Sequence, residues 1–128
     1  MRYLLPIDLP ATLRRNTSVE QFLGKSPVDA TYIRHVELRP ANDCIEVWMY
    51  DVKDVGSEDD SDLYDFAYFE PDGPRAPAAI FADAAAAVTY ASTSLAADPT
   101  RWTNLGIAES EHLDYLRAGR PSRWPVAI

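Results

Sequence analysis

The sequence predicts an α+β fold, in which an antiparallel β-meander of three to four strands has about three helices packed on one face. The first half of the chain holds segments of alternating or β-branched apolar residues, and two helical patterns follow them. The chain has 128 residues, of which 47% are hydrophobic and 25% are charged, and this usage is typical of a globular protein. We therefore expect one domain that spans residues 1–128.

The N-terminal part of the chain predicts a short strand and a short helix. Residues 1–9 have β character, but Pro6 interrupts them and Pro10 closes them, so this strand belongs at a sheet edge. Thr17 and Glu20 have the spacing of a capping box, which indicates a helix that ends near Gly24.

The middle of the chain predicts the rest of the sheet. Residues 31–38 and 44–52 contain alternating, β-branched and aromatic residues, and the turn-forming residues 40–43 between them predict an antiparallel hairpin. Residues 63–69 predict a third strand, which Pro71 and Pro74 end.

The last third of the chain predicts two helices. Asp83 can cap an alanine-rich helix that runs to about Ala96, before Asp98 and Pro99 terminate it. Residues 109–118 predict a final helix, with Gly119 at its end.

The acidic residues concentrate in one part of the chain. Of 20 acidic and 12 basic residues, the segment 43–72 contains eleven acids, with Lys53 as its only base. The eleven acids are Asp43, Glu46, Asp51, Asp54, Glu58, Asp59, Asp60, Asp62, Asp65, Glu70 and Asp72. Such a region repels nucleic acid and anionic membranes and attracts a cationic protein surface. The other interpretation is a solvated loop that only keeps the protein soluble.

The sequence indicates neither a cofactor nor a metal site. The acids of segment 54–65 lack the glycine and the closing glutamate of a calcium loop, and the histidines and the cysteine lack zinc-ligand spacing. No stretch is long and apolar enough for a membrane-spanning helix or a signal peptide. A single cysteine allows no internal disulfide. We therefore expect a cytoplasmic protein that binds neither nucleic acid nor membrane.

The sequence contains no enzyme motif, so we do not predict an enzyme. Cys44 could face His35 across the hairpin as a nucleophile beside its base. A cysteine in a strand is more often a small buried residue, and we favour that interpretation. We expect His112 on an exposed helix face.

Aromatic side chains occupy the same predicted strands as the acids. Trp48, Tyr50, Tyr64, Phe66 and Tyr68 could project to one sheet face. Beside carboxylates such a face suits a protein interface, because Tyr and Trp bury a large area and retain a polar tip. The interpretation that we favour instead is that this face is the core beneath the alanine-rich helix.

The stretch Asp98-Pro99-Thr100-Arg101-Trp102-Thr103-Asn104-Leu105-Gly106, followed by residues 109–119, is similar to a recurrent small bacterial domain. With its small size, acidic charge and lack of a catalytic motif, the chain resembles the immunity proteins that bacteria pair with polymorphic or contact-dependent growth inhibition toxins. The resemblance implies a stoichiometric inhibitor, or antitoxin, that binds a toxin domain with a basic surface, often a nuclease.

The predicted partner-binding residues combine acids with neighbouring aromatic residues. Carboxylates can replace the phosphates that a nuclease holds, and aromatic anchors slow dissociation. These residues are Trp48, Tyr50, Asp51, Asp54, Glu58, Asp59, Asp60, Asp62, Tyr64 and Asp65. This hypothesis requires that the carboxylates gather in one patch and are not neutralised by the protein's own arginines.

The alternative hypothesis is a small enzyme or ligand-binding domain, whose pocket lies between the aromatic sheet face and the helices. It requires a pocket in which a histidine lies beside a carboxylate with a shifted pKa.

Overall fold

The structure, a computed structural model, describes residues 2–126, and within them a five-stranded antiparallel sheet is combined with three α-helices. The strands are β1 (Val19–Lys25), β2 (Tyr32–Ala41), β3 (Cys44–Lys53), β4 (Ala79–Phe81) and β5 (Thr103–Asn104). The helices are α1 (Leu9–Arg14), α2 (Ala84–Ser94) and α3 (Ala108–Arg117), with 3-10 turns η1 (Pro6–Asp8) and η2 (Leu63–Asp65). The predicted α+β class is confirmed.

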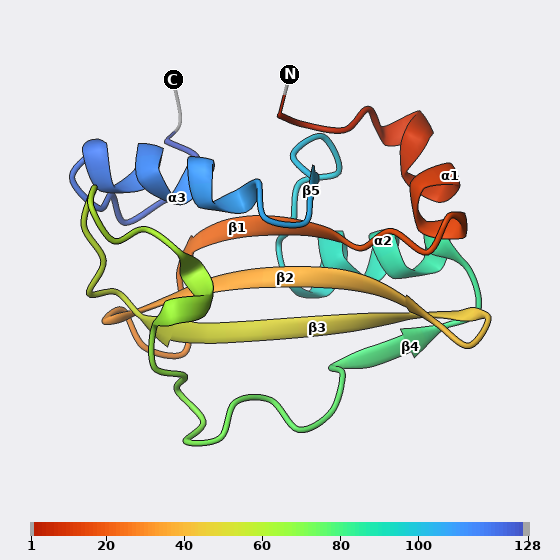
Figure 1. The fold of residues 1–128 in the computed structure, drawn as a ribbon, viewed down its shortest axis with the longest axis horizontal. Helices are drawn as coiled ribbons and strands as arrows, with labels where there is room; N and C mark the ends of the chain where they lie inside the picture. The colour runs from red at the N-terminus through yellow and green to blue at the C-terminus, as the bar shows by residue number, and fades with distance from the viewer. Residues whose placement is uncertain (1, 127–128) are drawn as a thin grey trace.

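The sheet has the strand order β4-β3-β2-β1-β5 (Figure 1). Strands β1 to β4 therefore form a meander in chain order, and β5 pairs with the outer edge of β1. The predicted hairpin forms from β2 and β3, whose register runs from Tyr32 opposite Lys53 to Ala41 opposite Cys44. Its two turn residues, Asn42 and Asp43, have φ of 49° and 63°, as a two-residue hairpin turn requires.

One face of the sheet packs against α1 and α2. Val36, Leu38 and Val47 point to this face and belong to one buried cluster with Leu13 and Trp102. The cluster also contains the buried alanines of α2, Ala87 and Ala91. Small side chains at these positions allow the helix to approach the strands closely.

The opposite face packs against α3. Phe22, Ile33 and Val52 alternate with the residues of the first cluster and form a second one with Tyr115 of α3. The expected placement of all helices on one face is therefore wrong. Both faces of the central strands carry apolar residues, and each face needs a cover of its own.

Three of the expected elements have a different structure. The segment predicted as a helix from Thr17 to Gly24 is strand β1, in which Val19, Glu20, Gln21 and Phe22 are all buried. Burial on both faces removes the alternation by which a strand is recognised. The side chain of Glu20 does accept hydrogen bonds from a helix start, but the helix is α3: its partners are the amides of Gly106 and Ala108.

The segments 63–69 and 1–9 also differ from the predicted strands. Residues Leu63–Asp65 form η2, and only Tyr68 makes an isolated bridge, to Val52. Near the N-terminus, Tyr3 makes one bridge to Thr103, and α1 follows soon afterwards. Pro10 lies in the first turn of α1, where its missing N–H costs no hydrogen bond.

Candidate functional site

Much of the predicted acidic segment forms a loop over the sheet face that α3 covers. We call residues 54–66 the acidic loop. In Figure 1 this yellow-green loop leaves the end of β3, approaches α3 and then reaches η2. Leu63 and Phe66 anchor it in the second apolar cluster. Gly56 allows a close approach to α3, because a Cβ there would lie 3.1 Å from Cε1 of His112 and 2.7 Å from the ring of Phe66.

Two of the predicted partner-binding acids serve the fold. Asp51 lies on the α2 side of the sheet and accepts two hydrogen bonds from Arg34, at 2.8 and 3.0 Å. The Asp54 carboxylate is buried and accepts hydrogen bonds from Tyr115 Oη at 2.9 Å and Arg120 Nε at 3.1 Å. The requirement that the protein's own bases leave the carboxylates free therefore fails at Asp51 and Asp54.

Surface ion pairs reduce the available charge further. Glu58 pairs with Arg117 at 2.8 Å, and Asp72 pairs with Arg75 at 3.2 Å. All four side chains are more than half exposed, and such pairs exchange readily with solvent and with other partners. Glu58 thus remains accessible to a partner, although it is not free of a counter-charge.

Four predicted acids remain exposed and near one another in the acidic loop. They are Asp59, Asp60, Asp62 and Asp65, and no ion pair within residues 2–126 involves them. Asp62 also accepts a hydrogen bond from the Tyr64 amide, at the start of η2. The gathered part of the acidic segment is therefore this loop and not the whole of residues 43–72.

The predicted aromatic residues lie on the sheet face opposite α2, so the interpretation of a core beneath the alanine-rich helix is wrong. Tyr50 is 7% exposed and donates a hydrogen bond to Glu37 at 3.1 Å. Trp48 is half-buried, with the Arg39 guanidinium 4.4 Å from its ring centroid. Tyr64 is the most accessible of the three, at 41% exposure. Of these three residues, Tyr64 therefore has the largest exposed fraction.

Tyr64 borders a pocket of about 340 Å³ beside the acidic loop. The pocket is lined by Glu20, Asp62, Leu63, Tyr64, Leu105, Gly106 and Glu109. Three of these seven residues are carboxylates, and none is basic. Leu105, at 51% exposure, supplies an apolar rim. This combination of negative walls and an apolar edge suits a cationic side chain with an apolar stem.

Glu20 forms the buried part of this pocket wall. Its carboxylate accepts hydrogen bonds from Tyr64 Oη at 2.8 Å, from the Gly106 amide at 2.9 Å and from the Ala108 amide at 3.1 Å. Burial raises the pKa of Glu20, because the charged form is removed from water, and these hydrogen bonds oppose the rise. Glu20 thus connects β1, η2 and the start of α3.

Sequence reasoning missed Glu20, Leu105 and Glu109 as site residues. The first was assigned to a local capping box, and the other two lie outside the acidic segment. No local sequence pattern indicates that these three residues line the same pocket as Tyr64. Their proximity to Tyr64 depends on the β1–β5 contact and on the path of the acidic loop.

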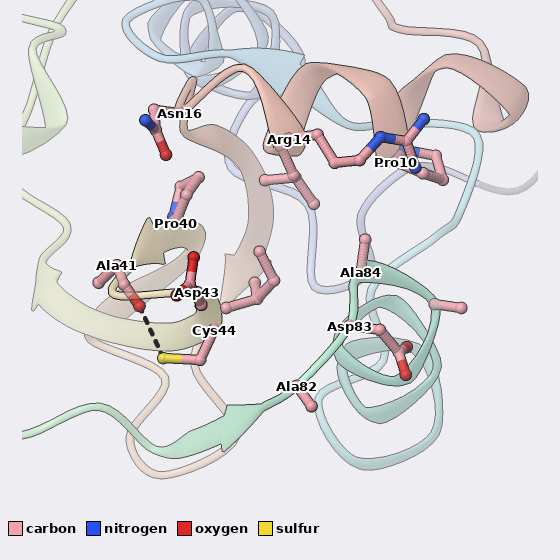
Figure 2. Close-up of a pocket in the computed structure, with 13 residues that line it drawn as sticks. Pro10, Arg14, Asn16, Pro40, Ala41, Asp43, Cys44, Ala82, Asp83 and Ala84 are labelled. Atoms are coloured by element: carbon pink, nitrogen blue, oxygen red, sulfur yellow. Dashed lines mark hydrogen bonds between the residues drawn. The ribbon is translucent and has the colours of Figure 1, made fainter.

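A larger cavity of about 590 Å³ lies on the α1 and α2 side of the molecule (Figure 2). Figure 2 shows it between α1, the β2–β3 turn and the start of α2, with Arg14, Asp43 and Asp83 among its polar residues. Cys44 also lines it, and its thiol donates a hydrogen bond to the Ala41 carbonyl at 2.8 Å. The cavity is therefore far from the acidic loop and on another face.

The histidines do not line either cavity. His35 lies opposite Tyr50 in the sheet, not opposite Cys44, so these two residues do not form a nucleophile and base pair. His112 is fully buried, and its expected exposed position is wrong. The alternative hypothesis required a histidine beside a carboxylate in a pocket, and both histidines lie outside these linings.

Neither a metal centre nor a membrane span is present in the described part of the chain. Among residues 2–126 no group of three or more His, Cys, Asp or Glu side chains is arranged to hold a metal ion. In the same range no helix has both the length and the apolar character that crossing a bilayer requires. No protein family, curated protein or solved structure matches the chain.

Proposed function

We propose that this chain is a stoichiometric inhibitor of the immunity-protein type, which binds a partner protein with a basic surface through the acidic loop and the pocket beside it. The observation that carries the proposal is the group of exposed carboxylates that form no ion pair with any residue from 2 to 126, next to an acidic pocket with an exposed tyrosine and an exposed leucine. The binding surface is accordingly smaller than the sequence predicts, because Asp51, Asp54 and Tyr50 belong to the fold.

The exposed acids of the loop would act while the partner approaches, before the two proteins touch. Asp59 and Asp60 lie at the tip of the loop, where the backbone of Asp60 pairs with that of Ser57, and both residues are exposed. Carboxylates in this position accelerate the encounter with a cationic surface and raise its salt dependence. They contribute little to the lifetime of the complex, because their charges remain hydrated.

The pocket would act after contact. A lysine or arginine side chain of the partner can place its charge between Asp62 and Glu109 and its methylene stem against Leu105 and the Tyr64 ring. Aromatic residues at such positions are common anchors in protein interfaces. Changes at Tyr64 should therefore alter the dissociation rate, whereas changes at Asp59 and Asp60 should alter the association rate.

The proposal can be tested with the partner that this chain captures from its native host. The captured protein is identified, produced separately and assayed for toxicity and for enzymatic activity. We expect one equivalent of this chain to abolish that activity. A partner that keeps its full activity when it is saturated with this chain would contradict the inhibitor function.

Two double variants with equal charge changes test the surface. Asp59→Lys with Asp60→Lys should lower the association rate at least 10-fold at low salt and flatten its dependence on ionic strength. Asp8→Lys with Glu70→Lys changes the net charge equally, at exposed positions outside the acidic loop. This control pair should change the rate by no more than about 2-fold. Equal effects of both pairs would contradict the assignment of the surface.

A further inference from the structure

The acidic loop covers a buried histidine, His35, which lies between two tyrosine rings. His35 is fully buried on β2, and neither ring nitrogen has a hydrogen-bond partner among residues 2–126. The Tyr50 ring stacks on it at 4.8 Å from within the sheet, and the edge of Tyr64 covers it from the loop at 5.1 Å. A buried polar group without a partner is costly, and its charged form is far more so.

The loop covers a second histidine in a similar way. His112 of α3 is fully buried and lies under Phe66 of the loop, with ring centroids 5.9 Å apart. Its Nδ1 lies 2.8 Å from the Ser61 carbonyl oxygen and donates a hydrogen bond to it, whereas no residue in the described part of the chain is a hydrogen-bond partner of its Nε2. Both histidines of the chain thus lie beneath the same thirteen-residue segment.

The groups that face the two imidazoles come from every element around them. For His35 they are Glu20 of β1, Glu37 of β2, Tyr50 of β3, Asp62 and Tyr64 of the loop, and His112 of α3, while Asp51 of β3 acts on it through the sheet from the opposite face. For His112 they are Asp54 of the loop, Glu109 and Tyr115 of α3, and Arg120. Most of these charges are negative and favour an imidazolium, so desolvation is the main cause that keeps the two rings neutral, and the nearby His112 and Arg120 add to it at His35 and His112 respectively.

Desolvation outweighs the surrounding carboxylates. Burial lowers the pKa of His35 from 6.5 to about 4, and it also lowers the pKa of His112. When the loop is open, water reaches the rings, and they bind protons below about pH 6.5. The closed state is therefore favoured fully above pH 6.5, and its advantage falls as the pH decreases toward 4.

We propose that the acidic loop is an acid-opened cover, which separates from the sheet and from α3 when His35 and His112 become protonated. The inference concerns the loop itself and holds whatever the loop binds. Its consequence for a complex would be release of the loop-bound partner at low pH, while the sheet remains folded.

The structure favours a local opening over global unfolding. The loop contains only η2 and the short bridge between Ser57 and Asp60, whereas β2 and β3 pair along ten residues each. Segments with few backbone hydrogen bonds open at a lower free-energy cost than long strand ladders. Opening exposes Leu63 and Phe66 but leaves the cluster beneath α2 intact.

Amide hydrogen exchange of the intact chain tests the inference without any partner. The amides of Asp60 and Asp65 report on the loop, because their hydrogen bonds lie within it. After correction for the intrinsic exchange rate, His35 alone should increase loop opening about 30-fold between about pH 7.5 and about pH 5. The amides of β2 and β3 should change much less. Loss of protection in the loop and strands together, or no loss in the loop, would overturn the inference.

Two variants separate titration from packing. His35→Phe places an apolar ring between Tyr50 and Tyr64 and should remove most of the pH response. Tyr64→Phe loses the hydrogen bond to Glu20 but keeps both histidines, so it should loosen the loop at both pH values and retain the response. If His35→Phe does not fold, an NMR titration that follows the Cε1 of His35 in the native chain tests the inference instead. Titration of His35 below about pH 5 supports the inference, and titration near pH 6.5 overturns it.

Discussion

The assignment of Asp54 to the fold, and not to the partner surface, leads to a direct prediction for Asp54→Asn. Asn retains one carbonyl oxygen, so the substitution removes one of two acceptor oxygens and the negative charge. The hydrogen bonds from Tyr115 Oη and Arg120 Nε end on different oxygens of Asp54, and Lys25 Nζ lies 3.7 Å from one of them. One charge-assisted hydrogen bond and the attraction to two bases are therefore lost.

The magnitude follows from the burial of these groups. A hydrogen bond to a charged group contributes about 1.5–3 kcal/mol. The Lys25 and Arg120 side chains are 25% and 37% exposed, so water compensates part of their loss. We expect Asp54→Asn to lower the free energy of unfolding by about 2 kcal/mol, which shifts the urea midpoint by roughly 1 M.

Asp59→Asn is the control, because it makes the same chemical change five positions away on an exposed side chain. It should alter the free energy of unfolding by less than about 0.5 kcal/mol. Urea denaturation of both variants, followed by fluorescence, measures the difference. If the two variants agree within about 0.5 kcal/mol, the structural role of Asp54 is refuted and its carboxylate is available for a partner after all.

Three further predictions concern stability. Glu20→Ala should lower the free energy of unfolding, measured by urea denaturation, by about 2–3 kcal/mol, because it leaves the buried Ala108 amide without an acceptor. Glu20→Gln retains a carbonyl oxygen and should lower it by less than half as much. Equal losses in the two variants would contradict this role of Glu20. Gly56→Ala should cost about 1–3 kcal/mol, since the new Cβ would lie 2.8 Å from the Asp60 carbonyl oxygen and 3.1 Å from Cε1 of His112 on α3. A gain in thermal stability would show that the acidic loop packs closely neither on itself nor on α3. Asp83→Ala should lower the free energy of unfolding by about 1 kcal/mol, because Asp83 accepts a hydrogen bond from the Ala86 amide at the start of α2. Asp83→Ser can still cap the helix and should retain most of the stability, as measured by calorimetry.

The sequence predicts the elements whose signals are local. The cap at Asp83 and the alanines after it predict α2, and the turn at Asn42 and Asp43 predicts the β2–β3 hairpin; both predictions are confirmed. Helix α3 also begins and ends within one residue of its predicted bounds. In each case the deciding hydrogen bonds join residues that are close in the chain.

The failed predictions concern elements that tertiary contacts decide. β1 is buried on both faces, so neither alternation nor helical periodicity identifies it. η2 replaces a strand because Leu63 and Phe66, three residues apart, both point inward, while Asp62 binds the Tyr64 amide. In the candidate site, sequence proximity alone places Asp59, Asp60 and Asp62 in one exposed loop, and their role in binding stays a prediction. It cannot reveal that Asp54 meets Arg120 or that Glu20 meets the start of α3.

The connection from Glu20 to α3 has a consequence for how the chain is made. Glu20 leaves the ribosome more than eighty residues before Ala108, whose amide it binds in the finished protein. During that interval β1 to β3 can pair, but the face that α3 will cover stays hydrated around an ionised glutamate. One face of the nascent sheet therefore lacks its covering helix until late in synthesis. A chaperone that shields this face would protect it from association with other chains during that period.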